Sequence, residues 1–459
     1  YITSYGQMDR NLQVAQATEN TQILKQMRVL ELYSGIGGMH FALRESGIPH
    51  NIIAAADINT VANQIYSHNF PSTKIITKTI EALTVTDFEK LGADMIVMSP
   101  PCQPYTRVGK QRDSEDSRAK SFIHLLEILA SLPKPPSYLL LENVKGFDTS
   151  HTRELMLQTL TDANYHVQEF LLTPLQFGVP NARLRYYMLA KRAPLDFHFD
   201  RKTEIWETIP ECVHQHLSHR IISKDRTHAY TCSCGSNANA TASSSHQHGS
   251  VSSDNNVNSV EDNIDPAETK AENIPHVKDV LLNCDTCSTK PCQTMTSERN
   301  NSDLPLHEKY LHLCQPVSAF LEDKPRDYFI PFAFPEKFYK RFWVMDIVRP
   351  ESRKCICFTK GYGHLIEGTG SILQEGLGRT VDHMKEHQEQ DPEVVAEVIR
   401  SLQLRFFTPQ EVANLMCFPQ YFSFPEDLST KQKYRVLGNS LNVHVVSILL
   451  RLLVYGDDR

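Results

Sequence analysis

Cys102 stands in the stretch VMSPPCQPYT, directly behind two prolines and at the end of an apolar run. Pro100 and Pro101 fix two φ angles and remove two backbone donors, so this loop holds its shape without a hydrogen-bond ladder. A thiol fixed in this way is a candidate nucleophile, provided that its pKa is lowered or a proton transfer assists it. A buried structural cysteine is the alternative, because free cysteines are among the most buried residues.

Other polar residues could act together with such a thiol. Glu142 ends the apolar stretch LLLEN, while Arg183 and Arg185 alternate at the start of another, so that their side chains point the same way. Near the C-terminus, Gly438 and Asn439 precede a predicted helix in YRVLGNSLNVHVV. Each has a structural alternative, namely a helix cap for Glu142, surface ion pairs for the arginines and an N-cap for Asn439.

The sequence SGIGG follows the first predicted strand and precedes a predicted helix. Gly35, Gly37 and Gly38 would let the backbone approach the polar groups of a ligand, and Asp57, which closes the next strand, is placed to bind a ribose diol. This pair suits an adenosine cofactor. The loop is shorter than the dinucleotide-binding GxGxxG pattern, which favours S-adenosylmethionine. A tight turn without a ligand is the alternative for these glycines.

Strand and helix patterns alternate through the first 190 residues, which predicts an α/β fold with a parallel sheet between helices. Strands are predicted in MRVLELY, NIIAAAD, ADMIVMS, SYLLLEN and RYYMLAK. Helices are predicted in MHFALRESG, in SFIHLLEILASL and in FFTPQEVANLMCFP, where Thr408 is the expected N-cap. Because ligands bind at the carboxyl ends of parallel strands, the chemical residues are expected together at this edge of the sheet.

Size and composition set further limits. The chain has 459 residues, 41% of them hydrophobic, which is enough for one large core or two smaller ones. No run of about 18 apolar residues and no secretory leader is recognised, so no membrane partner is expected. We expect an intracellular monomer in the cytoplasm, with the nucleus as a second location. The eleven cysteines are then expected to be reduced thiols.

Residues 230–310 hold eleven Asp and Glu against five Lys and Arg, which is most of the net charge of −7. This stretch is rich in Ser and Asn and has no apolar periodicity, which predicts a disordered acidic insertion. Residues 1–26, polar and Gln-rich, are predicted to form a flexible tail.

A zinc module is the alternative for part of this insertion, where Cys and His occur in paired spacings. The residues concerned are Cys232, Cys234, His246, His248, Cys284 and Cys287. Their irregular spacing and low-complexity surroundings argue against zinc, so no metal is expected.

Five of these motifs, in this order, resemble those of the cytosine-5 methyltransferases. LYSGIGG is similar to the cofactor loop, PPCQ to the nucleophile loop, ENV to the base-holding carboxylate, RLR to the paired arginines and GNS to the last cofactor motif. The resemblance covers residues 28–190 and about 400–459, and implies that they form a Rossmann-like S-adenosylmethionine-dependent methyltransferase core. Residues 191–400 would then contain a small inserted target-recognition domain, with IVRPESRKCICFTKGYGHLIEGTGS as its ordered part.

Three longer stretches, MSPPCQPYTRVGKQRD, ENVKGF and CFTKGYG, are more similar to one branch of that family. This branch contains the tRNA (aspartate) cytosine-5 methyltransferases, historically counted as a second type of DNA methyltransferase. The resemblance therefore implies methylation of the cytosine at position 38 in the anticodon loop of aspartate tRNA.

The chemistry of cytosine explains why these residue types are needed. C5 is a poor nucleophile, but addition of the Cys102 thiolate to C6 turns the ring into an enamine whose C5 can attack a methyl group. A carboxylic acid at N3 lowers the barrier of that addition, which suits Glu142. Arg183 and Arg185 would orient the carbonyl oxygen of the base.

By resemblance, the cofactor would meet one set of side chains and the substrate another. The cofactor residues are Ile36, Gly37 and Gly38 for the methionine end, Asp57 for the ribose, Ile80 and Glu81 for the adenine region, Ser99 near the methyl group, and Asn439 with Leu441 closing the site. The family often has an aromatic residue after the ribose carboxylate, where this chain has Ile58.

The substrate candidates are Arg107, Lys110 and Arg112, in a predicted mobile loop after Cys102, and Lys360, Tyr362 and His364. A solvated loop is the alternative for each of them. Weak or no binding of duplex DNA is expected, because the near-neutral core lacks a broad basic surface.

Other functions stay open as alternatives. A DNA cytosine-5 methyltransferase would share all of the motifs, and a non-catalytic nucleic-acid-binding protein would share the fold but not need Cys102. A dinucleotide oxidoreductase would share the sheet and the glycine loop, and would leave Cys102, Glu142 and the arginines without a joint role.

Overall fold

The computed structural model describes residues 26–105, 113, 116, 118–210, 306–376 and 392–454. The predicted N-terminal tail up to residue 25, most of the predicted insertion and all six Cys and His residues of the zinc alternative lie outside this part of the chain. The end of the predicted insertion is described, and there Leu306–Lys309 form helix α9.

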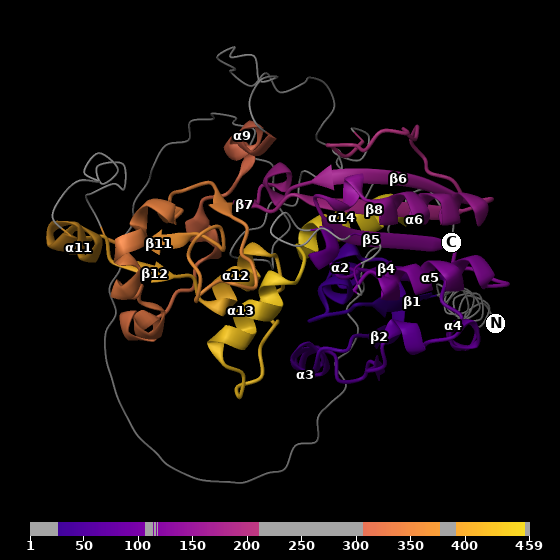
Figure 1. Ribbon diagram of the computed structural model, residues 1–459, viewed down its shortest axis with the longest axis horizontal. Helices are drawn as coiled ribbons and strands as arrows, with labels where there is room; N and C mark the ends of the chain where they lie inside the picture. The colour runs from indigo at the N-terminus through magenta and orange to yellow at the C-terminus, as the bar shows by residue number, and fades with distance from the viewer. Residues whose placement is uncertain are drawn as a thin grey trace, which may run out of the picture. The chain divides into compact units, whose positions relative to one another are not determined.

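In the described residues, the main sheet has seven strands in the order β3-β2-β1-β4-β5-β8-β6. It is drawn from indigo to magenta in Figure 1. Its strands are β1 (Met27–Leu32), β2 (His50–Ala56), β3 (Ile75–Ile76), β4 (Met95–Met98), β5 (Tyr138–Val144), β6 (Tyr165–Leu172) and β8 (Arg185–Arg192). The five strands β1 to β5 are parallel, as predicted. β8 instead runs antiparallel to both of its neighbours, which corrects the expectation of a wholly parallel sheet.

Alternate side chains of the strands enter separate cores on the two faces of this sheet. In β1, Met27 and Val29 belong to one core cluster, whereas Leu30 and Leu32 belong to the other. The first cluster includes side chains of α2 (Gly38–Ser46), α3 (Thr60–Asn69) and α14 (Val443–Val454). The second includes side chains of α4 (Val85–Leu91), α5 (Lys120–Ser131) and α6 (His151–Asp162).

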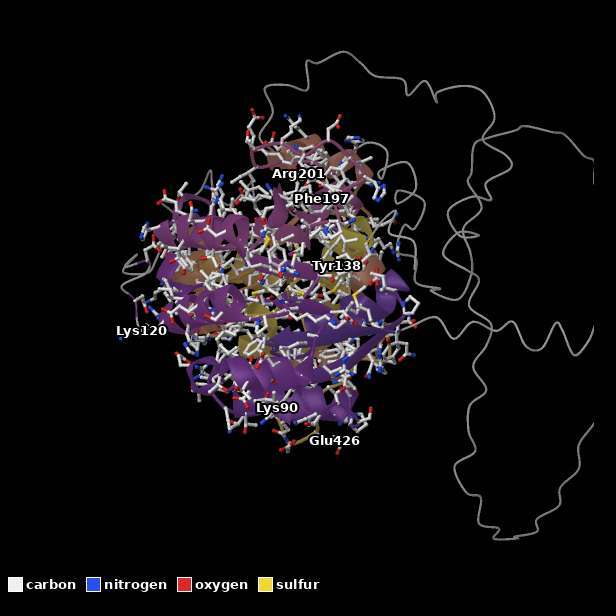
Figure 2. All side chains as sticks on the ribbon, turned by 90° about the vertical axis from the view of Figure 1, so that its right-hand side faces the viewer. Lys90, Lys120, Tyr138, Phe197, Arg201 and Glu426 are labelled. Atoms are coloured by element: carbon white, nitrogen blue, oxygen red, sulfur yellow. The ribbon has the colours of Figure 1, made fainter. Side chains whose placement is uncertain are left out.

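A sheet covered by apolar side chains on both faces leaves its strand ends for ligands. In Figure 2, Tyr138, the buried first residue of β5, lies near the centre of the view, while exposed Lys90 and Lys120 lie at the periphery.

The local predictions for the helices are confirmed. α2 ends before Gly47, whose φ of 73° is the left-handed conformation expected of a glycine C-cap. α12 (Pro409–Leu415) begins with the predicted capping box, in which the Thr408 side chain accepts from the backbone of Glu411. Asn439, however, caps the end of α13 (Thr430–Gly438) rather than the start of a helix.

A second, three-stranded sheet is formed by β9 (Ile347–Val348), β11 (Ile372–Gln374) and β12 (Leu404–Phe406), and the short α11 (Pro392–Ser401) precedes β12. β12 lies beyond the predicted boundary at residue 400, so the small sheet includes residues expected in the core. The boundary at residue 190 is also too early, because the backbone of Trp206 pairs with β6. A two-stranded sheet joins β7 (Asn181–Ala182) to β10 (Cys355–Ile356).

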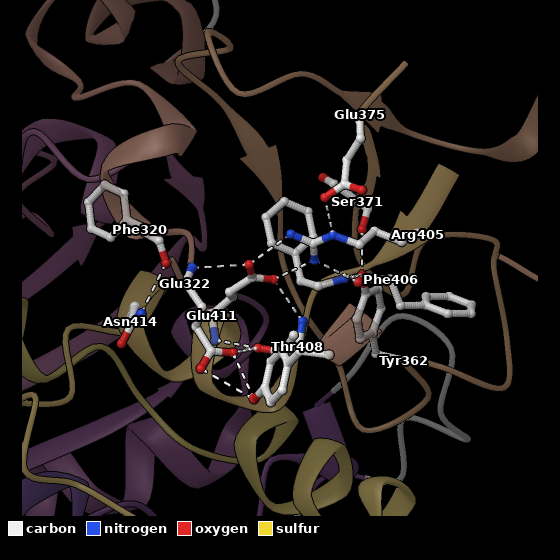
Figure 3. Close-up of polar contacts among 12 residues, drawn as sticks. Phe320, Glu322, Tyr362, Ser371, Glu375, Arg405, Phe406, Thr408, Glu411 and Asn414 are labelled. Atoms are coloured by element: carbon white, nitrogen blue, oxygen red, sulfur yellow. Dashed lines mark hydrogen bonds and ion pairs between the residues drawn. The ribbon is translucent and has the colours of Figure 1, made fainter. Parts of the chain in front are cut away.

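A buried ion pair fixes the small sheet to α12 (Figure 3). Arg405 of β12 is 3% exposed and donates from both Nη atoms to the carboxylate of Glu411, at 2.7 and 2.8 Å. Its Nε donates to Glu375 at 2.6 Å. Because the charge of a buried guanidinium must be compensated, this bidentate contact holds the two elements in one arrangement.

The segment Thr430–Val454, which contains α13 and α14, is long and apolar enough to cross a membrane. Within this segment, 78% of the 18-residue stretch with the highest hydropathy is buried inside the protein. The segment is therefore explained as a core element that packs against α2 and the sheet.

Candidate active site

A cavity of about 410 Å³ opens at the carboxyl ends of β1, β2, β4 and β5, the edge at which the sequence predicts the chemical residues. It is bordered by residues from both ends of the chain. The predicted residues that line it are Ile36, Gly38, Asp57, Ile80, Glu81, Ser99, Cys102, Glu142, Arg183, Arg185, Asn439 and Leu441. The fold thus brings all four expected chemical residues and eight of the nine expected cofactor residues to one place.

The loop after β4 holds Cys102 at the wall of this cavity. The side-chain amide of Asn143, which follows Glu142 in the ENV motif, donates to the backbone oxygen of Pro100 at 3.4 Å and so ties this loop to β5. Burial raises the pKa of the Cys102 thiol above its usual range, and the negative charge of Glu142 adds to this effect. Arg185 and Arg183 oppose it. The sulfur is therefore held as a thiol at neutral pH.

Glu142, at the end of β5, is 5% exposed. One of its oxygens accepts from Ser99 Oγ at 2.6 Å, and the other lies 3.4 Å from Nε of Arg185. Ser99 thus lines the cavity, as expected, and its hydroxyl also orients the carboxylate. A carboxylate fixed in this way faces the cavity with a defined geometry, which general acid catalysis requires.

The two arginines share a partner that the sequence analysis did not single out. Arg183 Nη1 donates to the sulfur of Cys357 at 3.2 Å, and Arg185 Nη2 lies 3.6 Å from the same sulfur. Burial alone would raise the pKa of Cys357, but the two positive charges outweigh it and lower this pKa below its usual range. Cys357 therefore acts as an anchor for both guanidinium groups. Its only sequence signal was its position in the CFTKGYG stretch.

Arg183 also joins distant parts of the chain. It is 3% exposed, and it donates to the backbone oxygens of Phe358, at 3.2 Å, and Ser440. At Gly438, a Cβ atom would lie 2.1 Å from the backbone nitrogen of Lys360, so only glycine allows this approach. The GNS and CFTKGYG motifs are thus packed against each other beside the arginines.

The opposite part of the cavity has the features expected for an adenosine ligand. Asp57 accepts from the backbone nitrogens of Gly35, at 2.9 Å, and Asn59, at 2.8 Å, which fixes the glycine loop to the end of β2. Gly38 packs against Leu441, where a Cβ would come within 2.9 Å of the leucine side chain. Ile58 lines the cavity and is 64% exposed, and Lys78, which the sequence analysis missed, lines it as well.

Two expected contacts are not supported by the structure. Gly37 does not line the cavity; its φ of 87° forms the turn before α2, and a Cβ there would collide with Phe70. Tyr362 is 2% exposed, because its ring packs against Phe358 and Tyr434 and its hydroxyl donates to the backbone oxygen of Ser371. Its side chain belongs to the hydrophobic core.

The remaining substrate candidates divide into two groups. Lys360 and His364 are exposed, on the loop that packs against Gly438. Arg107, Lys110 and Arg112 lie outside the described residues. Within the part of the chain that the structure describes, no group of three or more His, Cys, Asp or Glu side chains is arranged to hold a metal ion.

Comparison with known proteins decides the family. The profile of the C-5 cytosine-specific DNA methylases matches residues 27–454. The chain belongs to this C5-cytosine methyltransferase family. This C5-cytosine methyltransferase therefore carries the Rossmann-like core and the class of enzyme activity expected from its motifs.

Several relatives can be aligned with nearly the whole length of this methyltransferase. A mouse protein named tRNA (cytosine(38)-C(5))-methyltransferase is 41% identical over 436 residues, or 94% of each chain. A Dictyostelium discoideum protein named DNA (cytosine-5)-methyltransferase is 34% identical and covers 95% of this chain and 96% of its own. The crystal structure of a Spodoptera frugiperda DNMT2 mutant, 35% identical, superimposes with a TM-score of 0.64 over 93% of this chain and 99% of the other.

Proposed function

We propose that this enzyme transfers a methyl group from S-adenosylmethionine to C5 of a cytosine in tRNA. The observation that carries the proposal is the meeting of Cys102, Glu142, Arg183 and Arg185 at one cavity. The mouse relative, similar along nearly its whole length, is named for cytosine 38 of tRNA. We take the anticodon loop of aspartate tRNA as the substrate, which the branch-specific stretches of the sequence imply.

In this proposal, a bound water takes the proton of the Cys102 thiol when the base is bound, and the sulfur forms a bond to C6 of cytosine. The electrons of the C5–C6 double bond move to C5, which then accepts the methyl group. Glu142 holds a proton at N3, and Arg185 and Arg183 hold the carbonyl oxygen, so that the charge gained by the ring is stabilised. A bound water removes the C5 proton; the C5–C6 double bond re-forms and the sulfur leaves.

S-adenosylmethionine would supply an electrophilic methyl group on a sulfonium. The residues of the cavity fit its parts: Asp57 still has lone pairs for ribose hydroxyls, and Ile80 and Glu81 line the wall expected for adenine. Gly38 and Leu441 close the end expected for methionine.

Asp57→Ala should weaken S-adenosylmethionine binding by about 1 to 3 kcal/mol, because a hydrogen-bonded carboxylate is lost. Calorimetry on the purified protein measures this directly. Asp57→Asn, which keeps one acceptor oxygen, should lie between the wild type and the alanine variant. An unchanged affinity in Asp57→Ala would reject the assignment of this residue to the ribose.

The substrate preference gives a second test. We expect methyl incorporation into total tRNA to exceed that into duplex DNA by at least tenfold under the same salt. A base inside a duplex must be unpaired and flipped at a cost of about a few kcal/mol, whereas a loop base is already accessible.

The matched control is aspartate tRNA in which cytosine 38 is replaced by uracil, and incorporation should disappear there. Equal or greater incorporation into DNA would contradict this preference and would support DNA methylation as the function of the enzyme. The name of the Dictyostelium relative is the observation that favours this second candidate.

A further inference from the structure

The helix η9 (Glu336–Val344) presents a row of exposed side chains that the active site does not use. Lys337 and Lys340 are three residues apart, the period at which side chains of a 3₁₀-helix lie in line, and Trp343 follows three residues later in the sequence. The helix is interrupted at Arg341, and Trp343 beyond it is 56% exposed, whereas its neighbour Phe342 is 6% exposed. We call Lys337, Lys340 and Trp343 the η9 row.

Large aromatic side chains are seldom exposed on a surface that contacts only water. The packing below η9 does not explain why Trp343 is exposed. Phe334 stacks on Phe338 and Tyr339 with ring centroids 5.6 and 6.3 Å apart, so the inner face of the helix is already filled. The indole of Trp343 makes an edge-to-face contact with Phe342, with ring centroids 5.7 Å apart, and leaves the rest of its surface to the outside.

The charges around the η9 row favour a negatively charged partner. Glu336 and Glu393 share Arg400, at 2.9 and 3.1 Å, and Glu367 pairs with Arg341 at 2.6 Å, so each of these carboxylates has a guanidinium partner. Among the described residues, neither Lys337 nor Lys340 has an ion pair. The row therefore offers two ammonium groups without a carboxylate partner beside one exposed indole, and the ammonium of Lys337 also lies over the Phe338 ring, 4.9 Å from its centroid.

The η9 row is connected to the active site by a single loop. Glu367, the partner of Arg341, belongs to the segment 359–369, which is closed by a hydrogen bond from Thr359 N to Thr369 O at 2.8 Å. The same segment contains exposed Lys360 and packs against Gly438 at the wall of the cavity. A ligand bound at the cavity can thus follow exposed side chains of this loop as far as η9.

We propose that the η9 row binds the RNA substrate outside its target base, with an unpaired base stacked on Trp343 and phosphates held by Lys337 and Lys340. The proposal rests on the proposed function, since it requires an RNA that is bound at the cavity. Unpaired bases in RNA loops expose their faces, and aromatic side chains between basic residues are the usual platform for them. Duplex DNA offers phosphates but no free base face.

Tryptophan fluorescence tests the stack directly, because the chain has only two tryptophans. In the Trp206→Phe variant, Trp343 is the single reporter. Titration with aspartate tRNA should quench its emission, and titration with duplex DNA at the same salt should not. The reciprocal variant Trp343→Phe retains Trp206, whose ring packs against Phe170, and its emission should not respond to tRNA.

The energetic test uses variants of the same row. Trp343→Ala should raise the tRNA KM about tenfold, within the range that loss of one base–aromatic stack produces, and leave kcat at saturating tRNA near wild type. Trp343→Phe should restore most of the loss. Lys340→Ala should reduce the slope of log affinity against log salt by about 0.7 to 0.9, the loss of one phosphate contact. Tyr421→Ala, which removes an aromatic side chain that is 62% exposed and lies beside Phe41 of α2, should change neither quantity.

The outcomes separate this proposal from the proposed function. Wild-type protein that methylates no tRNA would contradict the function, whatever Trp343 does. If tRNA is methylated normally, but Trp343 is not quenched and Trp343→Ala leaves the KM unchanged, then only the proposed role of the η9 row is contradicted. A change in sedimentation of Trp343→Ala without a change in KM would also overturn it, and would assign this face to contact with a second protein.

Discussion

Replacing Cys102 with alanine should abolish methyl transfer while leaving the affinity for S-adenosylmethionine close to wild type. The sulfur acts on the base, and the cofactor residues such as Asp57 and Leu441 border the cavity from other elements. Without the sulfur, C5 of cytosine has no route to an enamine, so we expect a loss of roughly 10⁴-fold or more, the order seen when a catalytic nucleophile is removed. Single-turnover methylation of tRNA and calorimetry with the cofactor measure the two effects separately.

Cys357→Ala is the matched control, because Cys357 is the other thiol close to the arginines. It should impair catalysis much less, since the arginines keep their contacts with Phe358, Ser440 and Glu142. The wild-type rate should also rise with pH through the neutral range, because the raised pKa leaves Cys102 protonated below it. Turnover near wild type in Cys102→Ala would eliminate the covalent mechanism.

Replacing Glu142 with glutamine should lower the methylation rate by about 10² to 10⁴-fold, the contribution of a positioned general acid. Glutamine keeps an acceptor oxygen for Ser99, so the geometry of β5 and the nucleophile loop is retained. It cannot deliver a proton from oxygen to N3 of the base. The loss should appear in kcat at saturating tRNA.

The same variant allows an independent check on the folded site. The charge of Glu142 raises the pKa of Cys102, so its removal should make the thiol more acidic. Alkylation of Cys102 by iodoacetamide at neutral pH should then be faster in Glu142→Gln than in the wild type, although methylation is slower. If both reactions slow together, the substitution has disturbed the loop, and if methylation is unchanged, Glu142 is not the acid.

Much of the fold follows from local patterns in the sequence. Strands β1, β2, β4 and β5 are short apolar runs with polar residues at their ends, and the caps at Gly47 and Thr408 are local hydrogen-bond devices. The direction of β8 is different. An apolar run has the same composition in either direction, so only the connection through β6 decides that RYYMLAK runs antiparallel.

Site residues that lie near the end of a strand could be predicted from the sequence. Site residues whose position depends on a contact between distant parts of the chain could not. Cys102 follows β4 and Glu142 lies near the carboxyl end of the adjacent parallel strand β5, and such strand ends meet at one edge of a sheet. The burial of Tyr362 could not be predicted, because its partner Tyr434 lies far away in sequence and nothing in CFTKGYG shows that the ring is covered. Cys357 was missed for the same reason, since 174 residues separate it from Arg183.

Arg183 links segments that are synthesised at very different times. Its partners lie 174, 175 and 257 residues later in the chain, at Cys357, Phe358 and Ser440. A chain still growing on the ribosome therefore exposes Cys102 long before the arginines have their anchors, and its base-binding wall is incomplete until residues near 440 have emerged. We therefore expect a polypeptide that lacks the residues near 440 to be unable to methylate its substrate while it is still on the ribosome.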